Sequence, residues 1–90
     1  MMIKQQRDAL LKLLPEHVFV EVKGGDHFEA RWTTSNGVFK MDTGKWDDNT
    51  FVPPPNTRLR VFNETTGEYV ILKTESAARA QVALDLLGAL

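Results

Sequence analysis

Apolar side chains recur at helical spacing near both ends of the chain and alternate with polar side chains between those ends. Segment 2–14 has an apolar arc and a polar arc, which predicts an amphipathic helix that ends at Pro15. Segment 75–87 predicts a second helix, with Thr74 as its N-cap and Gly88 just beyond its last turn. We therefore expect a helix near each end of the chain.

Two alternating segments, 17–23 and 27–34, follow the first helix and are separated by the glycine-rich segment 24–26. A three-residue turn there would pair Val22 with Phe28 and keep the large apolar groups on one face. These segments are expected to form an antiparallel hairpin.

Asn36 and Gly37 form the clearest turn signal, because this dipeptide is typical of a two-residue type I′ hairpin. A turn centred on these two residues would place Arg31 opposite Asp42 as an exposed ion pair.

A further hairpin is expected from segments 57–63 and 69–74. Its apolar face would pair Leu59 with Leu72 and Val61 with Val70. The intervening segment 43–56 contains three consecutive prolines, which the interior of a sheet does not accommodate, so it is predicted to be a long loop.

Together these elements predict one domain, residues 1–90, of the α+β class. Short connections make consecutive strands antiparallel neighbours. We expect an antiparallel sheet of about five strands with the N-terminal and C-terminal helices packed on one face, in the order α-β-β-β-β-β-α. The apolar face of this sheet would carry Val18, Val20, Val22, Phe28, Trp32, Met41, Leu59, Val61, Val70 and Leu72.

Composition narrows the class of protein. The net charge of -1 gives no general attraction to nucleic acids or membranes. The chain contains no cysteine, which favours a reducing, cytoplasmic location, and no segment resembles a signal peptide or a membrane span. With only two histidines and no recognisable nucleotide motif, we expect neither a metal site nor a cofactor.

The sheet face away from the helices combines basic and aromatic side chains. We expect binding on this face or in the loop 43–56, with the candidate residues Arg58, Arg60, Lys73, Lys40, Phe62, Tyr69 and Trp46. The leading hypothesis is a small, non-catalytic interaction domain that binds an acidic protein partner, which fits the size of the chain, its missing catalytic groups and its surplus of apolar residues. The alternative is a nucleic-acid-binding domain, in which the same cations contact phosphates and the aromatic side chains stack on bases.

Two considerations bear on these hypotheses. Glu21, Glu29 and Asp42 share the same face and could neutralise its cations. If Arg58 and Arg60 instead bind a partner, changing both to glutamate should abolish binding and leave the fold intact.

A third hypothesis is a small oligomeric enzyme. The tripeptide Asp42-Thr43-Gly44 resembles the signature of aspartic proteases, which implies two copies of Asp42 sharing a proton across a dimer. The sequence departs from that family at Lys45, where a small residue is usual, and in its predicted terminal helices. Because no other catalytic motif is present, the sequence favours a protein that is not an enzyme.

The last predicted helix carries more apolar surface than one contact with a sheet uses. Val82 and Leu86 lie outside its main apolar stripe, and Leu90 follows it. Exposed apolar area of this kind marks interfaces, so we expect a symmetric homodimer.

Overall fold

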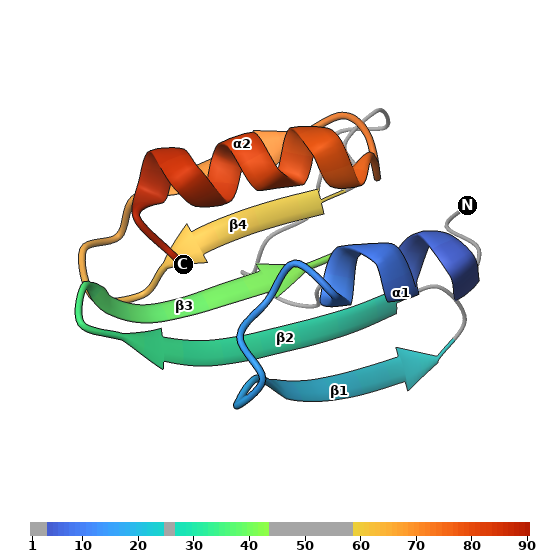
Figure 1. The fold of residues 1–90 in the computed structure, drawn as a ribbon, viewed down its shortest axis with the longest axis horizontal. Coiled ribbons are helices and arrows are strands. Elements are labelled where there is room, and N and C mark those ends of the chain that lie inside the picture. Colours follow the sequence, from blue (N-terminus) through green and yellow to red (C-terminus); the bar gives the residue numbers. More distant parts are fainter. Residues whose placement is uncertain (1–3, 25–26, 44–58) are drawn as a thin grey trace, which may run out of the picture.

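Strands pair in chain order to form an antiparallel sheet, and a helix from each end of the chain lies on the same face of it (Figure 1). The structure, a computed structural model, describes residues 4–24, 27–43 and 59–90. Within these residues the elements are α1 (Lys4–Leu11), β1 (Phe19–Gly24), β2 (His27–Thr34), β3 (Gly37–Asp42), β4 (Leu59–Asn63), β5 (Tyr69–Leu72) and α2 (Ala77–Leu87). The predicted α+β fold, with the order α-β-β-β-β-β-α, is confirmed.

The core lies between the two helices and the sheet. Its buried apolar side chains are Leu10, Leu14, Phe28, Ala30, Trp32, Phe39, Met41, Leu59, Val61, Ala80, Ala83, Leu84 and Ala89. Most of the predicted apolar face is buried here or packs against this cluster. Val22 is an exception, because it lies near the end of the edge strand β1 and is exposed.

Helix α1 is shorter than the predicted segment 2–14. The backbone N–H groups of Leu13 and Leu14 donate to the carbonyls three residues earlier, at 3.1 and 3.2 Å, so the chain tightens after the α-helical turns. Leu11 packs against the core, whereas Ala9 is exposed.

The first and last hairpins have the predicted apolar pairs. Val22 pairs with Phe28 across β1 and β2, although a bulge beyond Val22 brings Gly24 opposite His27. The apolar pairs across β4 and β5 are Leu59 with Leu72 and Val61 with Val70.

Helix α2 begins two residues later than predicted. Ser76 is its N-cap, and the Ser76 hydroxyl accepts from the backbone N–H of Arg79 at 3.4 Å. The Thr74 hydroxyl instead accepts from the backbone N–H of Ser76 at 3.1 Å. Gly88 ends the helix in the left-handed conformation, with φ 68°, as predicted.

The β2–β3 hairpin differs from the prediction by two residues. Thr34 pairs with Gly37, so the turn consists of residues 35–36, and Asp42 lies opposite Glu29 rather than Arg31. Because side chains alternate with a period of two, this shift leaves every side chain on its predicted face. The expected ion pair between Arg31 and Asp42 is therefore wrong.

Contacts with two distant segments account for this register. The Asn36 side chain donates through Nδ2 to the Gly88 carbonyl at 2.8 Å. Gly37 has φ 136° and lies against the β4–β5 turn, where an added Cβ would be 2.9 Å from the Thr65 hydroxyl and 3.0 Å from Asn63 Oδ1. Glycine at 37 is thus required by its backbone angle and by the close approach of a neighbouring turn.

We expect Gly37→Ala to lower the free energy of unfolding by about 1–3 kcal/mol, because it adds steric contact to backbone strain. Gly67→Ala is the matched control: Gly67 also has a positive φ, 85°, but an added Cβ there meets nothing within 4 Å. Chemical denaturation of both variants measures the difference. If Gly37→Ala lowers the free energy of unfolding no more than Gly67→Ala does, the close approach of Gly37 to the β4–β5 turn would be contradicted.

Candidate interaction surface

The sheet has a second face, opposite the helices, which we call the second face. Alternation along each strand places the intervening side chains there. In the described strands, the residues that pair with a neighbouring strand and lie on this face are Phe19, Glu21, Glu29, Arg31, Thr33, Val38, Lys40, Asp42, Arg60, Phe62, Tyr69 and Ile71.

A buried ion pair lies on the second face, at the end of β3 and the start of β4. Asp42 and Arg60 are cross-strand partners, and Arg60 Nη2 donates to Asp42 Oδ2 at 2.9 Å. Their side chains are only 1% and 11% exposed, respectively. The guanidinium of Arg60 also lies over the ring of Phe62, 4.9 Å from its centroid. Arg60 therefore holds a buried carboxylate in place.

Burial raises the pKa of Asp42 above its ordinary value of 3.8. The hydrogen bond and the charge of Arg60 act in the opposite direction and lower the pKa, but desolvation outweighs them. A buried carboxylate bound to an arginine has no exposed face for a substrate, so the geometry offers no support for Asp42 as a catalytic group.

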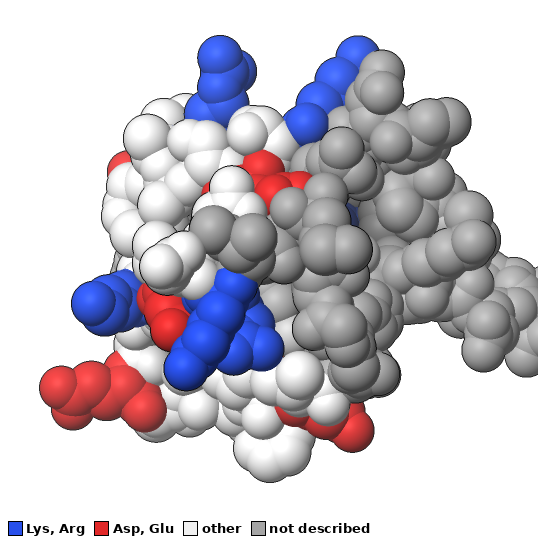
Figure 2. Space-filling view, turned by 90° about the vertical axis from the view of Figure 1, so that its right-hand side faces the viewer, with Lys and Arg blue, Asp and Glu red and all other residues white. Residues whose placement is uncertain are grey.

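Other cations of the second face also lie beside carboxylates. Lys40 Nζ is 3.6 Å from Glu29 Oε1. Arg31 contacts Glu64 at two points, since Nε lies 3.1 Å from Oε1 and Nη2 donates to Oε2 at 3.1 Å. In the side view of Figure 2, the basic and acidic side chains of the described residues are interspersed.

The structure brings together some of the predicted site residues. Lys40 pairs with Phe62, and Phe62 pairs with Tyr69, so these side chains form a row across three strands. Lys73 is exposed just beyond the end of β5. Arg58 and Trp46 lie outside the described residues.

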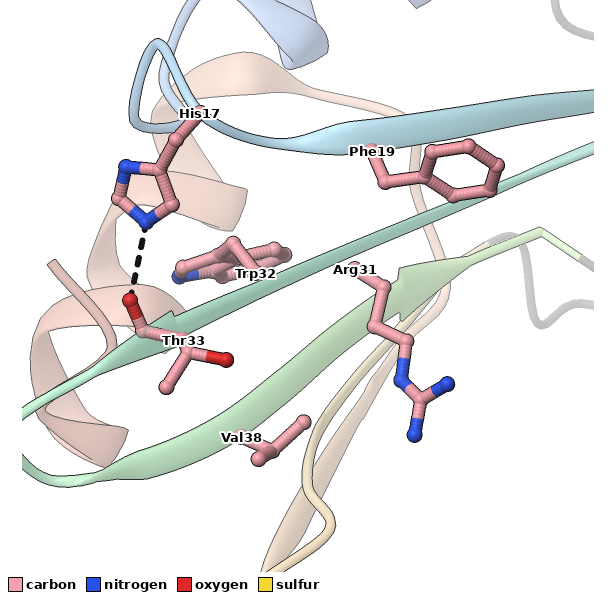
Figure 3. A pocket seen from close by; sticks show the side chains of 6 residues that line it. All are labelled: His17, Phe19, Arg31, Trp32, Thr33 and Val38. Carbon is pink, nitrogen blue, oxygen red and sulfur yellow. Dashed lines mark hydrogen bonds between the residues drawn. The ribbon is translucent and has the colours of Figure 1, made fainter.

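A hollow of about 410 Å³ opens on the second face near the start of β1. Its lining residues are His17, Phe19, Arg31, Trp32, Thr33 and Val38 (Figure 3). Phe19 and Arg31 are cross-strand partners on β1 and β2, and Val38 comes from β3. His17 Nε2 donates to the Thr33 carbonyl at 2.9 Å and so ties the segment before β1 to β2.

Phe19 and Arg31 are the lining residues of this hollow that can contact a ligand through an apolar ring and a cationic group. Phe19 is 69% exposed, and the Arg31 side chain is 57% exposed despite its contact with Glu64. A guanidinium has more N–H groups than the two that contact Glu64, so Arg31 can bind a second carboxylate. An adjacent phenylalanine ring offers apolar area to the same ligand.

Alternation along the strands places Phe19 and Arg31 on the second face, but neither was selected from the sequence as a site residue. The alternating pattern that assigned their face contains no signal for their exposure, which depends on the packing of the neighbouring strands. His17, one of the two histidines, was not selected from the sequence either. Its role at the edge of the hollow depends on the contact with Thr33, sixteen residues away.

The described residues contain no group of three or more histidine, aspartate or glutamate side chains that could hold a metal ion. None of the helices in the described part of the chain is long and apolar enough to cross a membrane.

Comparisons with protein-family models, with curated proteins and with solved structures found no match to this chain.

Proposed function

We propose that this chain is a small, non-catalytic interaction domain that binds an acidic segment of a cytoplasmic protein partner at the hollow beside β1. The observation that carries the proposal is the pairing of two exposed side chains, Phe19 and Arg31, on neighbouring strands. Burial of the exposed phenylalanine ring by a partner would contribute a favourable free energy of about 25 cal/mol per Å² of apolar area removed from water. Arg31 would provide specificity, because its guanidinium would bind partners that have a carboxylate beside an apolar group.

The charge distribution favours an acidic peptide over a nucleic acid. A phosphate backbone is bound by several cations that release counterions together. Here Arg60, Lys40 and Arg31 each already lie beside a carboxylate, and the whole chain has a net charge of -1. A single exposed arginine next to an aromatic ring suits one carboxylate better than a run of phosphates.

The test is a selection of short acidic peptides that also contain an apolar residue, followed by NMR titration of the protein with the selected peptides. We expect the backbone signals of β1, β2 and β3 around the hollow to shift. Arg31→Glu and Phe19→Ser should each weaken binding by about tenfold or more, as expected for an anchoring contact. Arg31→Lys should give an intermediate loss, because it keeps the charge without the two-point geometry.

Lys12→Glu is the matched control. It makes the same change of charge as Arg31→Glu at an exposed position near the end of α1, on the other side of the sheet. Peptide affinity in this variant should equal that of the wild type. Shifts confined to other surfaces, or equal losses in Arg31→Glu and Lys12→Glu, would reject the hollow as the site. Steeply salt-dependent binding to single-stranded RNA at the hollow would favour the nucleic-acid alternative instead.

A further inference from the structure

Helix α2 has an exposed stripe, part of which borders β5. Its members are Ala78, Arg79, Val82, Asp85 and Leu86, of which Val82 and Leu86 are 58% and 76% exposed. An apolar groove of about 340 Å³ runs between this stripe and β5, and it is lined by Val70, Leu72, Arg79, Val82, Ala83 and Leu86. This surface lies at the edge of the described sheet and is separate from the hollow beside β1.

The stripe is complementary to a reversed copy of itself. Arg79 lies three residues before Val82, and Asp85 lies three residues after it. Ala78 and Leu86 lie four residues before and after Val82. Two such helices packed antiparallel about Val82 would place Val82 against Val82, each Arg79 against an Asp85 and each Leu86 against an Ala78.

The two charges of the stripe oppose the dipole of their own helix. Arg79 lies in the first turn of α2 and Asp85 lies in the last turn, whereas a lone helix is stabilised by acidic residues at its start and basic residues at its end. An antiparallel partner helix reverses this relation, because it brings an acidic last turn beside the basic first turn. With respect to the helix dipole, the placement is therefore unfavourable in a monomer, where Asp85 Oδ1 accepts from Gln81 Nε2 at 3.2 Å, and favourable against a second copy.

We propose that a second copy of this chain is the partner of this surface, and that the two copies form a twofold dimer with antiparallel α2 helices centred on Val82. This proposal is independent of the peptide-binding function, because it uses the opposite edge of the domain. It also accounts for the apolar groove, whose lining from β5 and α2 the second copy would cover.

Strand β5 is compatible with the same twofold axis. Since α2 runs along the strands above β4 and β5, an axis perpendicular to the sheet makes both pairs of elements antiparallel (Figure 1). In the described sheet β5 is an edge strand, and adjacent strands lie about 4.8 Å apart. A helix midway between β4 and β5 would then lie about 9–10 Å from its copy, which is the usual distance between packed helices.

The backbone of β5 can take part in this contact. Asn63 donates its N–H to the Glu68 carbonyl at 2.8 Å, so Glu68 faces β4. In an antiparallel ladder the hydrogen-bonding direction alternates, which turns the backbone groups of Tyr69 and Ile71 toward the outer edge. These groups can pair with the same residues of the second copy, as in strand addition.

Sedimentation velocity of the full chain over a range of concentrations tests the proposal. The contact is short, with 11 residues in α2 and 4 in β5, so we expect dissociation constants on the order of micromolar. Val82→Glu should give a monomer at concentrations where the wild type is dimeric. Arg79→Asp and Asp85→Arg should each weaken the dimer by about tenfold or more, because each places like charges together twice.

The decisive measurement is an equimolar mixture of Arg79→Asp and Asp85→Arg, which should form a heterodimer because every facing pair is again of opposite charge. The double variant Arg79→Asp/Asp85→Arg should likewise dimerise with itself. The matched control is Lys12→Asp with Asp8→Arg, the same pair of charge changes at exposed positions in α1 and just beyond its end, and each of these should dimerise as the wild type does. A wild type that remains monomeric, or a dimer indifferent to the α2 variants, would overturn the proposal.

The two proposals fail separately. Val82→Glu should retain the peptide affinity of the wild type, and Arg31→Glu should retain its dimerisation. Loss of both properties in either variant, with an intact circular dichroism spectrum, would show that one surface serves both and would reject the independent dimer contact.

Discussion

Replacing Trp32 with alanine is expected to lower the free energy of unfolding by about 3–5 kcal/mol, because the change leaves a large cavity in the core. Trp32 is buried and stacks on Phe39, its cross-strand partner, with the ring centroids 6.0 Å apart. A domain of this size is stable by only about 5–15 kcal/mol, so the variant should be close to unfolding. Denaturation followed by circular dichroism measures the loss without relying on tryptophan fluorescence.

Trp32 also ties the C-terminal end of the chain to the sheet. Its indole Nε1 donates to the carbonyl of Ala89 at 2.7 Å, in a buried position. Trp32→Phe keeps most of the ring but leaves that carbonyl without its donor, so it should cost about 1–3 kcal/mol. Phe19→Ala, which removes an exposed ring from the same sheet, should cost much less than either. A denaturation midpoint of Trp32→Ala equal to that of the wild type would contradict the position of Trp32 in the core.

The sequence pattern was sufficient for the element order and for two of the hairpins. Apolar residues at alternate positions fix which side chains share a face, and the pairs Leu59–Leu72 and Val22–Phe28 then define the registers on either side of short turns. The β2–β3 register could not be chosen in this way, since a shift of two residues preserves every face. The contacts of Asn36 with Gly88 and of Gly37 with the β4–β5 turn distinguish the two registers, and both are tertiary.

The sequence predicted which side chains lie on the second face, but not which of its charged side chains form ion pairs. Alternation placed Asp42 and Arg60 on the same face, yet their direct pairing depends on the β3–β4 register. These strands are joined through segment 43–58, so no short turn specifies their alignment. The exposed residues Phe19 and Arg31 were not selected as site residues from the sequence for a similar reason. Their exposure depends on neighbours that are distant in sequence.

The pairing of Arg60 with Asp42 changes one expectation from the sequence. Charge reversal at Arg58 and Arg60 was expected to leave the fold intact. Glutamate at position 60 would place a second carboxylate beside a buried Asp42, and both groups would lose their compensation. We now expect that double variant to be destabilised, so its loss of binding would not identify a binding site.

Arg60→Met tests this structural role, because it removes the cation and keeps an unbranched side chain of similar length. At about pH 7 we expect it to lower the free energy of unfolding by about 3–5 kcal/mol, the cost of leaving a buried carboxylate unpaired. Arg31→Met makes the same chemical change at the exposed pair with Glu64 and should cost about 0–1 kcal/mol. The double variant Asp42→Asn/Arg60→Met should recover much of the loss, because no buried charge remains.

The loss in Arg60→Met should also depend on pH. Burial already raises the pKa of Asp42 in the folded state, and removing Arg60 removes its hydrogen bond and its charge, which are two of the three influences that lower this pKa; the charge of Lys40 is the third. The folded variant then binds a proton at pH values where the unfolded chain, with its ordinary pKa of 3.8, has released it. Stability of the variant must therefore fall as pH rises from near 3.8 through the raised pKa. Relative to the wild type, Arg60→Met should lose more stability at about pH 7 than at about pH 4. An equal loss at both values, or one no larger than that of Arg31→Met, would mean that Arg60 does not stabilise a buried Asp42.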